Sequence, residues 1–178
     1  MPLRSRPARP QDATAIAAIY REGIEDRLAT FETRPPGPAR VRAWLEARYP
    51  LVVVENRSGE VVAWASAPPY RQARDAYRAV AEFSVYVARA ERGRGAGRAA
   101  MEALLAEAEA RGLWKLVSRI FPENEASLAL CRALGFREVG VYRRHARLDG
   151  RWRDVVVVER LLAAAADEPG RPAPGDRG

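Results

Sequence analysis

Three glycines and three arginines are interleaved over residues 92–98, shortly after an apolar run that ends at Val87. Glycine permits positive φ and leaves no Cβ between the backbone and a ligand. Amides at the start of a helix attract anions, and the forked donors of arginine fit phosphate oxygens. The stretch therefore predicts a pyrophosphate site between a strand and a helix. Its residues are Arg92, Gly93, Arg94, Gly95, Ala96, Gly97 and Arg98.

Two common phosphate-binding loops differ from this stretch. A Walker-type loop needs Gly-Lys-Ser/Thr, whereas Gly97 is followed by Arg-Ala. A dinucleotide loop fits residues 95–100, which read Gly-Ala-Gly-Arg-Ala-Ala, but such a loop turns almost at once after its strand. Here seven residues separate Val87 from that loop, and the next apolar run, residues 116–121, ends without an acidic residue for the ribose. A nicotinamide cofactor is therefore disfavoured.

The composition is typical of a single globular domain. The chain has 178 residues, of which 48% are hydrophobic and 30% are charged. No apolar run reaches the roughly 20 residues that span a membrane, and the N-terminus lacks the apolar core of a secretory signal. Cys131 is the single cysteine, so we expect no disulfide and a cytoplasmic location. With His145 as the single histidine, the sequence predicts no metal site.

The formal charge of +7 comes almost entirely from arginine. Such an excess suits a polyanionic partner, either a nucleic acid or an anionic cofactor. The sequence offers neither a strip of stacking aromatic residues nor a recognition helix. We therefore expect no nucleic-acid partner, and the charge by itself does not identify the partner.

The apolar pattern predicts a mixed α/β fold, in which helices cover a mixed sheet. Asp12 is expected to cap the first helix, and Gly112 to end the helix that follows the glycine-rich stretch. We expect one domain over residues 1–162 and a disordered tail over residues 163–178. Strands are expected at residues 3–8, 51–55, 61–67, 80–87, 116–121, 136–142 and 152–162, with helices at residues 13–27, about 41–49, 99–111 and 125–134.

The pattern Arg92-x-x-Gly-x-Gly after a strand, with Asn124 and then Leu-Gly-Phe at residues 134–136, resembles the Gcn5-related N-acetyltransferase (GNAT) family. The resemblance extends from residue 3 to about residue 162 and includes the order of the elements. It implies a GNAT fold in which residues 92–98 bind the pyrophosphate of acetyl-CoA.

The same resemblance places the rest of the cofactor. It implies that the pantetheine arm pairs with the backbone of Val85, Tyr86 and Val87. It also implies that Asn124 contacts this arm, although Asn124 taken alone fits a plain helix N-cap equally well.

Residues 73–77, 82–87 and 150–154 are more closely similar to the phosphinothricin N-acetyltransferase branch, which includes arsinothricin and methionine sulfone or sulfoximine acetyltransferases. Residues 30–34 match the first substrate loop of this branch. The resemblance implies a homodimer that acetylates the α-amino group of a small glutamate-like amino acid. It assigns the acceptor to Phe31, Arg74 and Tyr77. The segment around His145 departs from the phosphinothricin enzymes and fits the arsinothricin type better.

Acetyl transfer to an ammonium group needs a base, because the amine must lose a proton before it attacks the thioester. Glu82 matches the glutamate base of the family, and a backbone N–H near Tyr86 or Val87 would stabilise the oxyanion. Many relatives protonate the leaving thiolate with a tyrosine, but that position here holds Cys131. Either its thiol or a water molecule would donate the proton.

Two other functions stay open from the sequence. The same fold could acetylate a protein N-terminus, as ribosomal-protein acetyltransferases do, in which case an open peptide groove is expected. The chain could also be a non-catalytic acyl-CoA-binding module, which would bind acetyl-CoA without releasing its thiol. The loops around Phe31 and Arg74 favour a small enclosed anion.

Overall fold

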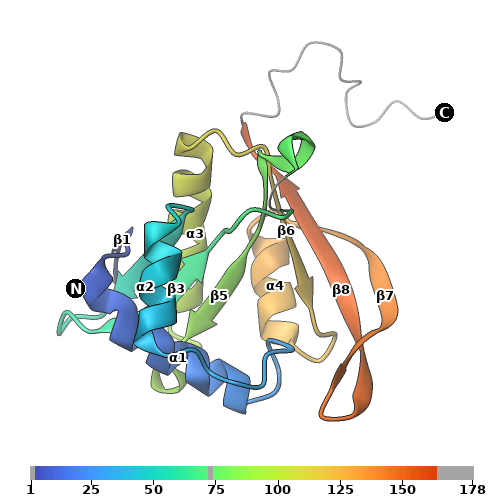
Figure 1. Cartoon of the computed structure of the whole chain (residues 1–178), viewed down its shortest axis with the longest axis horizontal. Helices are drawn as coiled ribbons and strands as arrows, with labels where there is room; N and C mark the ends of the chain where they lie inside the picture. Colours follow the sequence, from blue (N-terminus) through green and yellow to red (C-terminus); the bar gives the residue numbers. More distant parts are fainter. Residues whose placement is uncertain (1–2, 72–73, 164–178) are drawn as a thin grey trace.

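The computed structural model describes residues 3–71 and 74–163 and consists of two four-stranded sheets with four α-helices (Figure 1). The first sheet is antiparallel and has the order β1 (Arg4–Pro7), β2 (Leu51–Glu55), β3 (Val61–Ser66), β5 (Ser84–Val87). The second has the order β4 (Val80–Glu82), β6 (Lys115–Ile120), β8 (Arg151–Leu161), β7 (Arg137–Leu148), with β4 and β6 parallel. The predicted mixed α/β class is confirmed, but the strands form two sheets.

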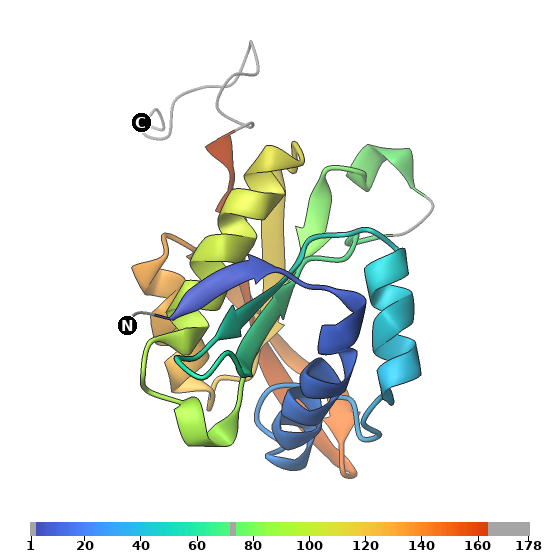
Figure 2. The same cartoon turned by 90° about the vertical axis from the view of Figure 1, so that its left-hand side faces the viewer.

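Helices α1 (Ala13–Glu25) and α2 (Pro38–Glu46) cover one face of the first sheet, and α3 (Ala96–Ala110) covers the other (Figure 2). Alternate residues of β2 point to opposite faces: Val53 packs against α1 and α2, and Val54 packs against α3. The core cluster that contains Val54 also includes residues of α4 (Glu125–Ala133), β6 and β8, so it joins the two sheets. Short 3-10 helices lie at η1 (Pro10–Asp12), η2 (Asp75–Tyr77) and η3 (Arg89–Glu91).

The predicted strand at residues 80–87 is divided at Phe83, and its halves belong to different sheets. The N–H of Phe83 donates to the carbonyl of Val117 in β6 at 2.9 Å, and the Phe83 ring lies 4.8 Å from that of Phe136. Beyond Phe83 the chain leaves β6 and pairs with β3 instead. The two sheets therefore diverge at Phe83, and β5 and β6 face each other without being paired.

Several element ends differ from the expected ones. Helix α3 begins at Ala96 rather than at residue 99, because Gly95 at φ +90° turns the chain directly into the helix. Helix α1 ends at Glu25, and Arg27 is left-handed at φ +56°. Strand β7 continues to Leu148 instead of ending at residue 142, since its pairing with β8 resumes after an irregularity. Residues 164–178, which include almost all of the predicted tail, lie outside the described residues.

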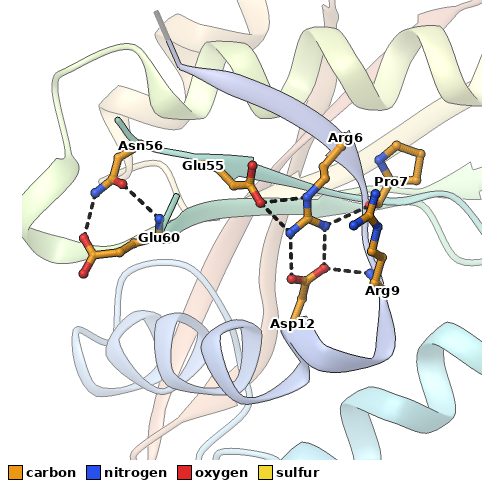
Figure 3. A network of polar contacts seen from close by, with 7 residues as sticks. All are labelled: Arg6, Pro7, Arg9, Asp12, Glu55, Asn56 and Glu60. Carbon is orange, nitrogen blue, oxygen red and sulfur yellow. Dashed lines mark hydrogen bonds and ion pairs between the residues drawn. The ribbon is translucent and has the colours of Figure 1, made fainter. Parts of the chain in front are cut away.

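Asp12 binds arginine rather than capping α1 (Figure 3). Its carboxylate accepts two hydrogen bonds from the Arg6 guanidinium, at 2.7 and 2.9 Å, and one from the N–H of Arg9 at 2.7 Å. Arg6 also donates to Glu55 at 2.8 Å. Burial opposes the ionisation of Asp12, but the hydrogen bonds from Arg6 and Arg9 outweigh it and hold the pKa of Asp12 below its usual value. This network ties β1, η1 and β2 together.

Within residues 3–71 and 74–163, none of the helices combines the length and the apolarity needed to cross a membrane.

Candidate active site

The divergence at Phe83 leaves one edge of β5 without a partner strand among the described residues. The N–H of Ala88 donates to the carbonyl of Val62 at 2.8 Å, and alternate residues of an antiparallel strand repeat this pattern. Tyr86 therefore bonds to β3, whereas the N–H and C=O groups of Val85 and Val87 point the other way, toward β6. This edge can pair with an extended ligand that carries amide groups.

The start of α3 forms an anion site beside this edge. Gly93 and Gly95 have φ angles of +74° and +90°, which residues with a Cβ rarely adopt. The first N–H that closes a helical hydrogen bond is that of Ala99, which donates to the carbonyl of Gly95 at 3.0 Å. The amides of residues 96–98 therefore have no partner within the helix and concentrate positive potential at its start.

Arg92 is fixed beside the open edge by two contacts. Its Nε donates to the carbonyl of Val87 at 3.3 Å, and its Nη1 lies 2.6 Å from the Asp26 carboxylate at the end of α1. Arg89 also binds Asp26, at 2.7 Å. Burial raises the pKa of Asp26, but the hydrogen bonds from Arg89 and Arg92 outweigh this effect and lower it. In contrast, Arg94 and Arg98 extend into solvent, where they pair with neighbouring glutamates.

A cavity of about 420 Å³ contains these groups and is here called the glycine-loop cavity. Gly97 lines it where a Cβ would come within 3.3 Å of Val87 Cγ2, so only glycine leaves this wall undisturbed. Nine of the eleven residues predicted to bind the cofactor line this cavity, and Arg94 and Ala96 do not. The nine are Val85, Tyr86, Val87, Arg92, Gly93, Gly95, Gly97, Arg98 and Asn124.

A second cavity of about 280 Å³, here called the Glu82 cavity, lies between β5 and β6 where the two sheets diverge. Glu82, Arg119 and Phe31 line it, together with a second carboxylate, Glu32. The two cavities meet, because five residues line both. These are Ala29, Val85, Tyr86, Asn124 and Ser127.

Glu82 carries an arginine partner that the sequence did not indicate. The Nη2 and Nε of Arg119, from β6, donate to Glu82 Oε1 at 2.6 and 3.0 Å. Arg119 Nη1 also lies 3.3 Å from Nε2 of His145 in β7. The second oxygen of Glu82, Oε2, has no hydrogen-bond partner among the described residues, so it is available to a ligand or to water.

Phe31 closes the Glu82 cavity from the segment between α1 and α2. Its ring meets that of Phe121 edge-on at 4.9 Å and packs against the small cluster that Phe121 forms with Leu148 and Val155. The same segment is tied to the β7–β8 turn by Arg27, which donates to Asp149 at 2.8 Å. Phe31 therefore forms a fixed wall of the cavity, held by Phe121 just after β6 and by residues of β7 and β8.

Comparison with known proteins identifies the class of enzyme that uses this arrangement. Residues 16–136 match the Acetyltransferase (GNAT) family. The chain belongs to this family. The resemblance stated from the glycine-rich stretch, the fold class and the expected enzyme class are thereby confirmed.

Individual relatives within the GNAT family align over nearly their whole length. The chain is 34% identical to the L-methionine sulfoximine/L-methionine sulfone acetyltransferase of Pseudomonas paraeruginosa, over 92% of this chain and 94% of that protein. It resembles a phosphinothricin acetyltransferase from Sinorhizobium meliloti, solved in complex with acetyl-CoA, with a TM-score of 0.87 and 32% identity over 98% and 95% of the two chains. It also resembles a ribosomal-protein-alanine N-acetyltransferase from Brucella melitensis, with a TM-score of 0.84 and 35% identity over 89% and 99% of the two chains.

Arg74 and Tyr77 lie apart from both cavities of this GNAT protein. They belong to the segment around η2, where the Tyr77 ring lies 5.9 Å from that of Tyr70 and the Arg71 guanidinium lies 5.3 Å from the Tyr77 ring. The neighbouring residues 72 and 73 lie outside the described part of the chain. An acceptor-binding role for Arg74 and Tyr77 stays a prediction.

Asn124 and Cys131 face the junction from α4. The Asn124 side chain caps the helix by accepting from the N–H of Ser127 at 3.2 Å, and it also lines both cavities, so the two alternatives for Asn124 do not exclude each other. Cys131 lines the Glu82 cavity. Burial raises the pKa of its thiol to about 12, whereas an ordinary thiol has a pKa of about 8.5. Cys131 is therefore a weaker acid than the thiol it would have to protonate.

Three hydroxyl groups at the junction also escaped sequence analysis. The side chains of Tyr20, Thr30 and Tyr86 line the Glu82 cavity together, and the rings of Tyr20 and Tyr86 lie 4.7 Å apart. Burial raises the pKa of both tyrosines, so they stay protonated at neutral pH. Tyr20 lies in the helix predicted at residues 13–27, where its spacing from Ile16 and Ile24 fits a packing face. Nothing in its spacing distinguishes a cavity-lining tyrosine from a core residue.

Proposed function

We propose that this GNAT protein transfers the acetyl group of acetyl-CoA to the α-amino group of a small glutamate-like amino acid, such as phosphinothricin, arsinothricin, methionine sulfone or methionine sulfoximine. The observation that carries the proposal is the junction of the two cavities at the unpaired edge of β5. One cavity contains an anion site, the other contains Glu82, and both reach Val85 and Tyr86. The names of relatives from Pseudomonas and Sinorhizobium support this class of acceptor.

On the donor side, the amides of residues 96–98 and the guanidinium of Arg92 would bind the pyrophosphate of acetyl-CoA. The backbone of Val85 and Val87 would pair with the amides of the pantetheine arm, which places the thioester at the junction. An N–H on this edge would stabilise the oxyanion. The N–H of Tyr86 is not a candidate, because by alternation it bonds to β3.

On the acceptor side, Glu82 would take the proton that the ammonium group must lose, directly or through a water molecule on Oε2. The amine then attacks the carbonyl carbon, so a C–N bond forms and the C–S bond breaks. The nitrogen gives up its second proton, the leaving thiolate takes up a proton, and the thiol of coenzyme A is released. Phe31 would exclude water from this side.

The cellular setting is part of the same proposal. We propose a cytoplasmic homodimer, built on one domain over residues 1–162, that detoxifies its acceptor and so provides resistance. The alternative acceptor, a protein N-terminus, is supported by the neighbour from Brucella melitensis, whose name states that activity.

A thiol-release assay with acetyl-CoA tests the proposal. The acceptors are phosphinothricin, arsinothricin, methionine sulfone, methionine sulfoximine, glutamate and a short peptide with N-terminal alanine. We expect release with at least one amino-acid analogue and little with the peptide. Release with the peptide alone would replace the proposal by the alternative, and binding of acetyl-CoA without release for any amine would contradict both.

A further inference from the structure

Arg119 is the only arginine or lysine among the described residues that line the Glu82 cavity. Two carboxylates, Glu32 and Glu82, line the same cavity. A cavity that receives a free amino acid must accommodate an α-carboxylate as well as an α-ammonium group. An isolated carboxylate in a partly desolvated cavity requires a cationic or N–H partner. Arg119 is placed to be that partner.

The contacts of Arg119 leave part of its guanidinium available. Of its five N–H donors, one each on Nε and Nη2 binds Glu82, and one on Nη1 binds His145. Two donors, one on each terminal nitrogen, have no partner among the described residues. The side chain is 44% exposed, so a ligand can reach it. Because Glu82 and His145 already hold the guanidinium, little rotational freedom is lost when a ligand binds.

The pair that Arg119 forms with Glu82 matches the charges of a free amino acid. The charged groups of the pair lie 2.6 Å apart, and the ammonium and carboxylate groups of an amino acid are joined through a single carbon atom. We propose that Arg119 binds the α-carboxylate of the acceptor while Oε2 of Glu82 receives its α-ammonium group. The proposal rests on the proposed acetyl transfer to a free amino acid and assigns a specificity-determining residue to it.

This arrangement has a consequence for the choice of acceptor. In a peptide, the carbon next to the α-amine carries a neutral amide instead of a carboxylate. A peptide could still bind Glu82 but would leave the two donors of Arg119 without a charged partner. Arg119 would therefore favour free amino acids over protein N-termini.

The test compares L-methionine sulfone with its α-carboxamide as acceptors, at saturating acetyl-CoA. The sulfone side chain is uncharged, so the α-carboxylate is the only anion that differs between the two compounds. The enzymes are the wild type, Arg119→Met, Arg119→Lys and Arg132→Met. Arg132 is the matched control, because it is an ion-paired arginine on α4 that lines neither cavity.

We expect Arg119→Met to lower the preference for the acid over the amide, as a ratio of kcat/KM values, by about 10–100-fold, which corresponds to the loss of a charge-assisted hydrogen bond. The change should lie mainly in the KM of the acid, with Arg119→Lys intermediate and Arg132→Met unchanged. An unaltered KM for acetyl-CoA shows that the variants are folded. The ratio between variants cancels the intrinsic difference in reactivity between the two amines.

Two results would overturn this assignment while leaving the proposed function in place. If Arg119→Met slows both acceptors equally, Arg119 only positions Glu82, and if neither acceptor is affected, Arg119 has no role in binding. A wild type that acetylates peptides but neither sulfone compound would instead refute the proposed function and this inference with it.

Discussion

At the scale of single residues, the proposed reaction depends on which carboxylate of the Glu82 cavity accepts the proton. Glu82 is the last residue of β4 and has one oxygen without a partner among the described residues, whereas Glu32 belongs to the segment between α1 and α2. Both face the same cavity, so proximity alone does not decide between them. Substitution by glutamine keeps the shape of each side chain and removes its basicity.

Glu82→Gln is expected to lower kcat by about 10²–10⁴-fold, since a positioned base contributes that much to proton transfer. The KM for acetyl-CoA should change little, because Glu82 does not line the glycine-loop cavity. Steady-state thiol release with both substrates varied gives the two constants. If Glu32→Gln causes the large loss and Glu82→Gln does not, the base is Glu32.

Cys131→Ala is expected to change kcat by less than about 3-fold near neutral pH. The thiol, with its pKa raised to about 12 by burial, is a poor proton donor to a thiolate whose conjugate acid has a pKa of about 8.5. The leaving thiolate would then take its proton from the bulk solvent rather than from a buried group. A loss of kcat of tenfold or more in Cys131→Ala, with the melting temperature retained, would show that the thiol is the donor after all.

At the scale of elements, the position of α1 against β5 shapes both cavities. Gly23 of α1 lies over the ring of Tyr86, and a Cβ at Gly23 would come within 2.6 Å of Tyr86 Cδ1. Both residues line the glycine-loop cavity, and Tyr86 also lines the Glu82 cavity. The absence of a side chain at Gly23 therefore sets the distance between the helix and the strand.

Gly23→Ala is expected to destabilise the fold by about 1–3 kcal/mol, the usual cost of overpacking a close contact. It should also raise the KM for acetyl-CoA, because α1 or the Tyr86 ring must shift into the cavity. Gly140→Ala is the matched control, since a Cβ at Gly140 meets no atom within 4 Å. Chemical denaturation and thiol-release kinetics measure the two effects. Equal behaviour of the two variants would contradict this account of the α1–β5 contact.

At the scale of the whole molecule, carboxylates bound to cationic side chains make the free energy of unfolding depend on pH. The pKa values of Asp12, Asp26 and Glu159 are all lowered in the folded chain, because hydrogen bonds from cationic side chains outweigh the effect of burial. A lowered folded pKa contributes stability above the unfolded values, which are about 4. That contribution is lost as the pH falls through the folded pKa values.

The melting temperature is therefore expected to be nearly constant from about pH 8 to pH 6 and to fall steeply below about pH 4. Arg6→Met should lower the free energy of unfolding at pH 7 by about 2–4 kcal/mol, since it leaves two largely buried carboxylates without their partner. It should also weaken the acid dependence, because the pKa of Asp12 would rise toward its unfolded value. Thermal unfolding from pH 3 to pH 8 provides the measurement, and an unchanged acid limb in the variant would contradict the role of Arg6.

The sequence alone determined the features that depend on local order. The glycine-rich stretch after an apolar run predicted a strand, a turn with positive φ and a helix start, and the structure confirms all three around Gly95. Nearly all of the helices and strands lie where the apolar pattern placed them, with shifted ends. Family membership followed from the same local pattern, because the spacing of Arg92, Gly95 and Gly97 is fixed along the chain.

Only the tertiary structure decided how the cavities are built. The alternation of side chains between the two faces of a sheet along residues 80–87 would be the same in one continuous strand as in two. The division at Phe83 and the unpaired edge of β5 therefore depend on which strands lie on either side. Arg119 reaches Glu82 from a position 37 residues further along the chain, and His145 reaches Arg119 from 26 residues beyond that, and no local pattern encodes such a meeting. Residues that share a cavity are brought together by sheet pairing, which acts between segments that are distant in sequence.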